Sequence, residues 1–76
     1  GVEVVLVDNR GSKLPENVRL ATLRRLEELV RTSTGGRIVA RTAPEGYSEV
    51  VTILKVDAER NLTTIDEAGT VTVRKT

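Results

Sequence analysis

The chain has 76 residues, enough for a single domain spanning 1–76. Twelve Lys and Arg residues against eleven Asp and Glu residues give a net charge of +1, too small to indicate nucleic acid or a charged membrane as partner. Cys and His are absent, so we expect no disulfide, thiolate nucleophile or metal cofactor. No apolar run is long enough to cross a bilayer, and a small soluble domain of unknown compartment is therefore expected.

A strand and a long helix are expected first. Residues 2–7 (VEVVLV) are short, β-branched and apolar, as in a buried strand. Pro15 then suits the first turn of a helix that we expect over 15–33, ended by Gly35 and Gly36. Leu26 would lie at the centre of its buried face. The apolar stripe comprises Val18, Leu23, Leu26, Leu29 and Val30, and the opposite face carries Arg24, Arg25, Glu27, Glu28 and Arg31.

Three further strands are expected in the second half. Residues 37–43 (RIVARTA) and 48–56 (SEVVTILKV) are rich in β-branched residues. The intervening segment Ala43-Pro44-Glu45-Gly46 fits a type I turn, so these two strands should form a hairpin. Residues 69–75 (GTVTVRK) alternate Val with polar residues and predict a last strand.

The segment 57–68 (DAERNLTTIDEA) leaves the fold open between two arrangements. Ala58, Leu62 and Ile65 have helical spacing, which gives βαββαβ: a ferredoxin-like two-layer sandwich with a four-stranded, mainly antiparallel sheet. Alternatively, 62–65 is a short strand, and one helix lies across a βαββββ meander, as in cystatin-like folds. We expect the ferredoxin-like α+β arrangement, because it places the two most apolar strands at the centre of the sheet and the basic ones at its edges.

One helical layer covers only one face of such a sheet, yet the first and third strands are apolar on both faces. We therefore expect an apolar patch on the open face. No partner is required: a monomer whose sheet tolerates Val and Ile in water is one outcome, and a weak homodimer through the open face is the alternative. With Val4, Leu6, Val50 and Leu54 toward the helix, the far face would carry Val5, Val7, Val39, Val51 and Ile53, rimmed by Glu3, Arg41, Glu49 and Lys55.

No catalytic constellation is visible in the sequence. Ser12, Ser33 and Ser48 lie near turns or element ends, where hydrogen bonding to the backbone is the usual role, and no base accompanies them. The loop that connects the first strand to the helix is the one candidate site. Its residues Arg10, Gly11, Ser12 and Lys13 would form a weak anion site near a helix N-terminus, although they do not match a P-loop, and a plain solvated connection is the alternative.

Asp8, Gly11 and Leu14 have a D-x-x-G-x-x-L spacing that resembles the first βα loop of ACT regulatory domains. The resemblance covers residues 2–14 and implies a ferredoxin-like fold that binds a small molecule at a subunit interface. Arg10 stands where that family usually has Pro before the Gly.

The residue types that are missing suggest how the chain arose. Cys, His, Met, Phe, Trp and Gln are absent and Tyr47 is the only aromatic residue, so the core must consist of Val, Ile, Leu and Ala. Protein designers prefer those residues because their rotamers are well defined. A designed or composition-simplified protein with no intrinsic biochemical function is therefore our leading expectation. The alternative is a small ligand- or protein-binding regulatory module of ACT-like type.

Overall fold

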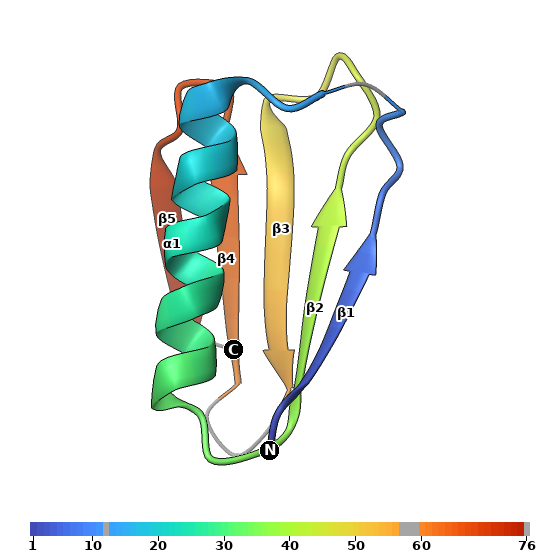
Figure 1. Cartoon of the computed structure of the whole chain (residues 1–76). Coiled ribbons are helices and arrows are strands. Elements are labelled where there is room, and N and C mark those ends of the chain that lie inside the picture. Colours follow the sequence, from blue (N-terminus) through green and yellow to red (C-terminus); the bar gives the residue numbers. More distant parts are fainter. Residues whose placement is uncertain (12, 57–59, 76) are drawn as a thin grey trace.

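The computed structural model describes residues 1–11, 13–56 and 60–75. In this part of the chain one helix packs on one face of a five-stranded mixed sheet (Figure 1). The expected α+β class is confirmed, and the helix ends lie within one residue of the predicted ones. The elements are β1 (Glu3–Val7), α1 (Glu16–Thr32), β2 (Arg37–Thr42), β3 (Glu49–Val56), β4 (Asn61–Asp66) and β5 (Val71–Lys75).

The strands follow one another across the sheet in chain order, β1-β2-β3-β4-β5. β1 and β2 are parallel because α1 carries the chain back from the end of one to the start of the other. The remaining neighbours are antiparallel, and β2 to β5 form a meander. β1 and β5 are therefore the two edges of the sheet.

The segment 57–68, for which the sequence allowed either a helix or a strand, contains strand β4. Thr63 and Ile65 of β4 are buried while their neighbours Leu62 and Thr64 are partly exposed, which is the alternation of a strand with one covered face. The second helix of the ferredoxin-like prediction is therefore wrong over 61–66, and the sheet has five strands rather than four. The β-branched residues Thr63, Thr64 and Ile65 are compatible with a strand, and pairing with β3 and β5 selects it over the helical spacing. Asp57 and Ala58, the expected start of that helix, lie outside the described residues.

The register assigns each strand residue to one face of the sheet. One row that faces α1 runs Leu6, Ala40, Ile53, Thr63 and Val73 across the five strands. The core lies between this face and the helix. Its buried apolar residues are Val18, Leu29, Ile38, Ala40, Val50, Val51, Ile53 and Ile65.

The buried face of α1 differs from the expected one. Val18 and Leu29 are buried, but Leu26 is only partly buried, and Leu23 and Val30 are exposed. The helix packs against β3 and β4 and stands away from β1 (Figure 1), so Leu23 lines an open region in front of β1. The prediction that Leu26 forms the centre of the core is wrong, because Leu26 packs at its margin while Val18 and Leu29 are the buried residues of α1.

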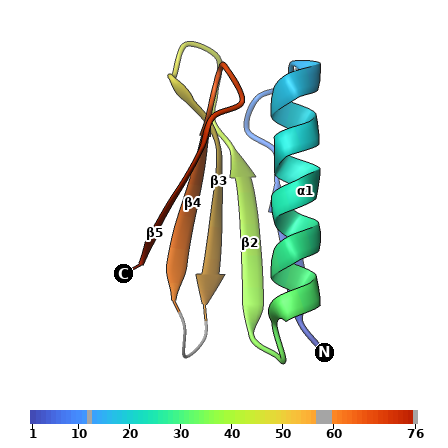
Figure 2. The same ribbon diagram turned by 90° about the vertical axis from the view of Figure 1, so that its left-hand side faces the viewer.

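The far face of the sheet also differs from the expected one. Val51 and Ile53 face the helix, whereas Leu54 lies on the far side. Val4 and Leu6 of β1 face the helix as expected, but pairing through β2 places Ile53, and not Leu54, on the same face as Leu6. Val50 and Val51 are both buried beside a register irregularity between Glu49 and Val51. Lys55 is buried on the helix side rather than at the far rim. Val5, Val7 and Val39 lie on the far face as expected, where Leu54 and Leu62 join them in place of Val51 and Ile53. Figure 2 shows that α1 covers only the opposite face of the sheet.

The turn between β4 and β5 rests against the start of α1. The Asp66 carboxylate accepts hydrogen bonds from the backbone N–H groups of Ala68 and Thr70, both at 2.9 Å. Gly69 has a φ of +82°, and a Cβ there would lie 3.2 Å from the carbonyl oxygen of Asn17. Glycine is therefore required twice over, by the backbone conformation and by the contact. Within the described residues, no helix is long and apolar enough to cross a membrane.

Candidate binding groove

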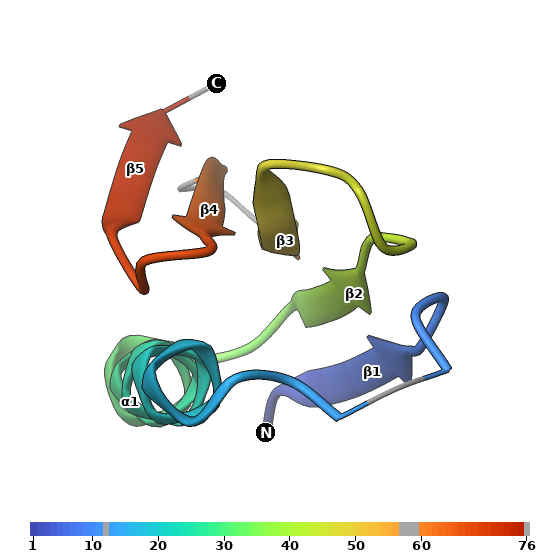
Figure 3. The same cartoon turned by 90° about the horizontal axis from the view of Figure 1, so that it is seen from above.

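An apolar groove of about 300 Å³ lies between α1 and β1. It exists because α1 packs against β3 and β4, which leaves Val4 and Leu6 on the helix-facing side of β1 exposed. Viewed from above (Figure 3), the sheet curves so that β1 lies beside the helix, and the segment before α1 connects the two. The groove is lined by Leu6, Val7, Asp8, Leu14, Arg19, Thr22, Leu23, Leu26, Ala40, Arg41, Thr42 and Val51.

The two walls of the groove are exposed aliphatic side chains. Leu6 on β1 is 71% exposed and Leu23 on α1 is 52% exposed. Ala40, which pairs with Leu6 across the sheet, places a small side chain at the floor and so deepens the groove. Fully burying one leucine is worth about 1.5–3 kcal/mol, so a molecule that covered both walls would gain a favourable apolar contribution.

The end of the groove nearest the β1–α1 connection is polar. The Asp8 carboxylate accepts hydrogen bonds from the Arg10 backbone N–H at 3.0 Å and from the Thr42 hydroxyl at 2.8 Å. The Asn9 N–H donates to the same hydroxyl at 2.8 Å. The bond from the Arg10 N–H, followed by that from Thr42, lowers the pKa of Asp8 below its ordinary value of 3.8. Arg19 lines the groove as well.

The predicted anion loop has a different arrangement from a phosphate-binding loop. Gly11 has a φ of +72° and Lys13 is exposed, while Ser12 lies outside the described residues. The Arg10 backbone N–H donates a hydrogen bond to the Asp8 carboxylate, and the Arg10 side-chain Nε is buried without a hydrogen-bond partner. The helix begins only at Glu16, whose carboxylate occupies the first turn. Asp8 therefore already occupies a backbone N–H that an anion would use, and Glu16 adds a negative charge to the first turn. Anion binding at this loop stays a prediction.

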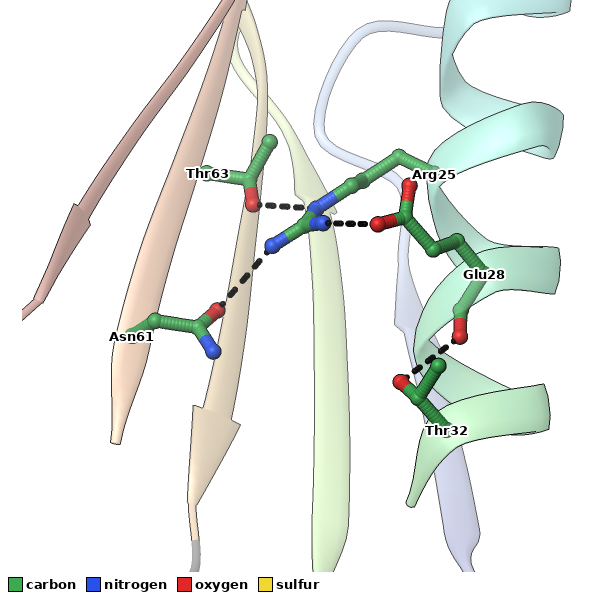
Figure 4. Close-up of polar contacts among 5 residues, drawn as sticks. All are labelled: Arg25, Glu28, Thr32, Asn61 and Thr63. Carbon is green, nitrogen blue, oxygen red and sulfur yellow. Dashed lines mark hydrogen bonds and ion pairs between the residues drawn. The ribbon is translucent and has the colours of Figure 1, made fainter. Parts of the chain in front are cut away.

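A second polar cluster joins the helix to the sheet (Figure 4). Arg25 Nε donates to the Thr63 hydroxyl at 2.9 Å, and Nη2 donates to Asn61 Oδ1 at 3.5 Å. Glu28 pairs with Nη1 at 3.3 Å, and the Thr32 hydroxyl donates to the Glu28 backbone carbonyl at 2.8 Å. Helical periodicity predicts Arg25 on the face opposite the apolar stripe, but only 13% of its side chain is exposed. All three guanidinium nitrogens have partners within the protein, which indicates a structural role.

The other residues considered for chemistry do not converge. Ser33 ends α1, and Ser48 lies just before β3. Among the described residues, no three His, Cys, Asp or Glu side chains come together in a way that could hold a metal ion. Comparisons with protein-family models, curated proteins and solved structures found no match to this chain.

Proposed function

We propose that this protein is a non-catalytic binding module whose groove between α1 and β1 accepts a small molecule with an aliphatic portion. The observation that carries the proposal is the apolar lining of the groove together with the exposure of Leu6 and Leu23 on its two walls. Small-molecule sites are typically concave and mostly apolar, with a few polar groups that orient the ligand. Here Arg19 and the Asp8–Thr42 pair supply that polar end.

The proposal rests on the groove and not on the ACT-like resemblance. Asp8 and Leu14, two of the three residues that carry the resemblance, do line the groove. The ACT-like version would require the ferredoxin-like topology, however, whereas here β4 follows β3 directly and β1 lies at the edge of the sheet. One helix against an antiparallel meander corresponds more closely to the cystatin-like alternative, which we propose at the level of fold alone.

A chain made to fold, with no intrinsic biochemical function, is the second candidate. Its support is the core, whose buried apolar residues are all Val, Ile, Leu or Ala. Against it stands the open groove, because a sequence optimised only for folding would cover or replace a leucine as exposed as Leu6. Ligand binding distinguishes the two candidates.

The test is a titration of the ¹⁵N-labelled protein with 1-decanol, a neutral aliphatic probe, followed by amide chemical shifts. We expect saturable shifts at the amides of Leu6, Leu23 and Ala40, with a Kd on the order of 0.1–1 mM for a ligand of this size. The variant Ala40→Leu should abolish these shifts, because a larger side chain at the floor fills the groove.

The matched control is Ala21→Leu. Ala21 lies on the other flank of α1, in a separate depression with Arg24, Arg25 and Glu28, so this variant should bind decanol as the wild type does. Absence of saturable shifts in the wild type, or equal binding by both variants, would contradict the proposal and favour the second candidate.

A further inference from the structure

We propose that two copies of this chain associate through β1, whose free edges pair antiparallel about a two-fold axis to form one continuous ten-stranded sheet. This inference concerns the edge of β1 and does not depend on whether the groove binds a ligand. The homodimer considered from the sequence used the open face of the sheet, whereas the dimer proposed here uses the edge of β1.

The backbone of β1 is the first support. The Glu3 N–H donates to the Gly36 carbonyl at 3.0 Å, so the backbone groups of Glu3 point toward the β2 side. Backbone groups alternate in direction along a strand, and those of Val4 and Leu6 therefore point away from β2. β1 is a terminal strand of the sheet, which leaves these groups as a row of donors and acceptors at its edge.

In one antiparallel register, the outward-directed backbone groups of each copy form hydrogen bonds with those of the other copy. With Val5 on the two-fold axis, Val4 lies opposite Leu6 of the second copy, and Leu6 lies opposite Val4 of the second copy. These are hydrogen-bonded pairs, since both residues have outward-directed backbone groups. Their side chains lie on the same face as the groove, where Val4 is 42% exposed and Leu6 is 71% exposed. Pairing would shield both from water, and such aliphatic cross-strand pairs stabilise sheets.

The charges are compatible with this register. Glu3 would lie opposite Val7 of the second copy, and Asp8 opposite Val2, so no like charges face each other. Beyond β1, the neighbouring strand carries Arg37, which pairs with Glu3, and Arg41. The acidic residues of one copy would therefore approach the basic second strand of the other, which favours two copies of this chain as mutual partners.

The other surfaces are less suited to a second copy. β5, the opposite edge, carries Arg74 and Lys75, and such charges protect an edge strand from pairing. On the far face of the sheet, Val5, Val39 and Leu54 are each partly buried, and Arg37 and Arg41 rim the patch. β1 has neither a basic residue nor a proline among its strand residues.

Sedimentation equilibrium from about 10 μM to about 1 mM tests the inference, because that range brackets weak association. The wild-type mass should rise with concentration from 8.3 kDa toward twice that value. Val4→Lys should weaken association at least tenfold, because it introduces a charge at the centre of the interface. Val73→Lys makes the same change on the helix-facing side of β5, where Val73 is 47% exposed, and should leave association unchanged.

A mixed sample of labelled and unlabelled wild-type chains provides a readout that depends on no variant. Intermolecular NOEs between Val4 and Leu6 are expected. A constant mass of 8.3 kDa up to 1 mM would overturn the inference, and would leave β1 open to a strand from a different protein. A dimer that lacks these NOEs, or that Leu54→Lys on the far face dissociates while Val4→Lys does not, would also overturn it.

Discussion

At the scale of single residues, Arg25 is the position where packing overrode the sequence pattern. It lies in a helix face rich in charged residues, yet its guanidinium reaches the sheet between Thr63 and Asn61. Thr63 is fully buried, so its hydroxyl depends on partners inside the protein. An unsatisfied buried polar group costs about 1–3 kcal/mol, which makes this contact more important than an ordinary surface ion pair.

We predict that Arg25→Met lowers the free energy of unfolding by about 1–3 kcal/mol, because it keeps the aliphatic stem and removes the donor to Thr63. Arg24→Met, one residue earlier on the exposed side, should change it by less than about 0.5 kcal/mol. Urea denaturation measures both. The double variant Arg25→Met/Thr63→Val should recover part of the loss, since both polar partners are then replaced. Strictly additive effects would show that the two side chains do not interact.

Asp8 supplies a pH-dependent contribution to stability. Its pKa is lower in the folded protein than its ordinary value of 3.8, because the ionised carboxylate accepts bonds from Arg10 and Thr42. Such a group stabilises the fold above pH 3.8, and the contribution is lost as the pH falls through the folded pKa. Asp8→Asn should therefore reduce the fall in urea midpoint between pH 5 and pH 2. Glu16→Gln is the control, and equal slopes for wild type and Asp8→Asn would contradict the prediction.

At the scale of elements, the placement of α1 over β3 and β4 decides which helix residues contribute to the core. Leu29 is buried, Leu26 is partly buried at the groove, and Leu20 is 42% exposed. Truncating a buried leucine removes many apolar contacts and leaves a cavity, whereas truncating a largely exposed one removes fewer contacts and leaves no enclosed cavity.

We predict that Leu29→Ala lowers the free energy of unfolding by about 2–5 kcal/mol. Leu26→Ala should cost distinctly less, and Leu20→Ala less than about 0.5 kcal/mol. All three variants carry the same substitution in one helix, so differences in helix propensity cancel. Urea midpoints in the order Leu29→Ala, Leu26→Ala, Leu20→Ala from lowest to highest are expected. A lower midpoint for Leu26→Ala than for Leu29→Ala would contradict the packing of α1 over β3 and β4, which buries Leu29 more than Leu26.

At the scale of the whole molecule, stability should decrease from the middle of the sheet to its edges. β3 has a hydrogen-bonded neighbour on each side and the helix above it, and Val51, Ile53 and Lys55 are buried. β5 has one neighbour, and all five of its residues are exposed. Elements with few buried contacts open locally at a lower free energy than the whole domain.

Native-state hydrogen exchange should show this gradient. We expect the slowest amides in β3, exchanging only through global unfolding. The amides of β5 that bond to β4 should exchange through local openings that urea hardly affects. Equal protection of β3 and β5 would indicate that the edge is held by contacts beyond those described, as association through β5 would provide.

The sequence by itself determined the elements that depend on local physics. The helix follows from a 3.6-residue apolar period between Pro15 and Gly35, and the strands from β-branched runs bounded by turn formers. For the candidate site, the sequence located the Asp8–Leu14 connection, but it did not predict the groove. No local signal distinguishes Leu6 and Leu23, which remain exposed, from Val18 and Leu29, which are buried.

Tertiary contacts decided the remaining features of the fold, which are the strand at 61–66, the orientation of β3 and the position of α1. Residues 61–66 satisfy a helical spacing and a strand preference about equally, and pairing with β3 and β5 selected the strand. Pairing of β1 and β3 with β2 decided which residues of β3 share the helix-facing side with Val4 and Leu6. The offset of α1 toward β3 and β4 buried Arg25 and opened the groove in front of β1. Each of these outcomes depends on contacts between residues far apart in the chain, and local periodicity carries no information about them.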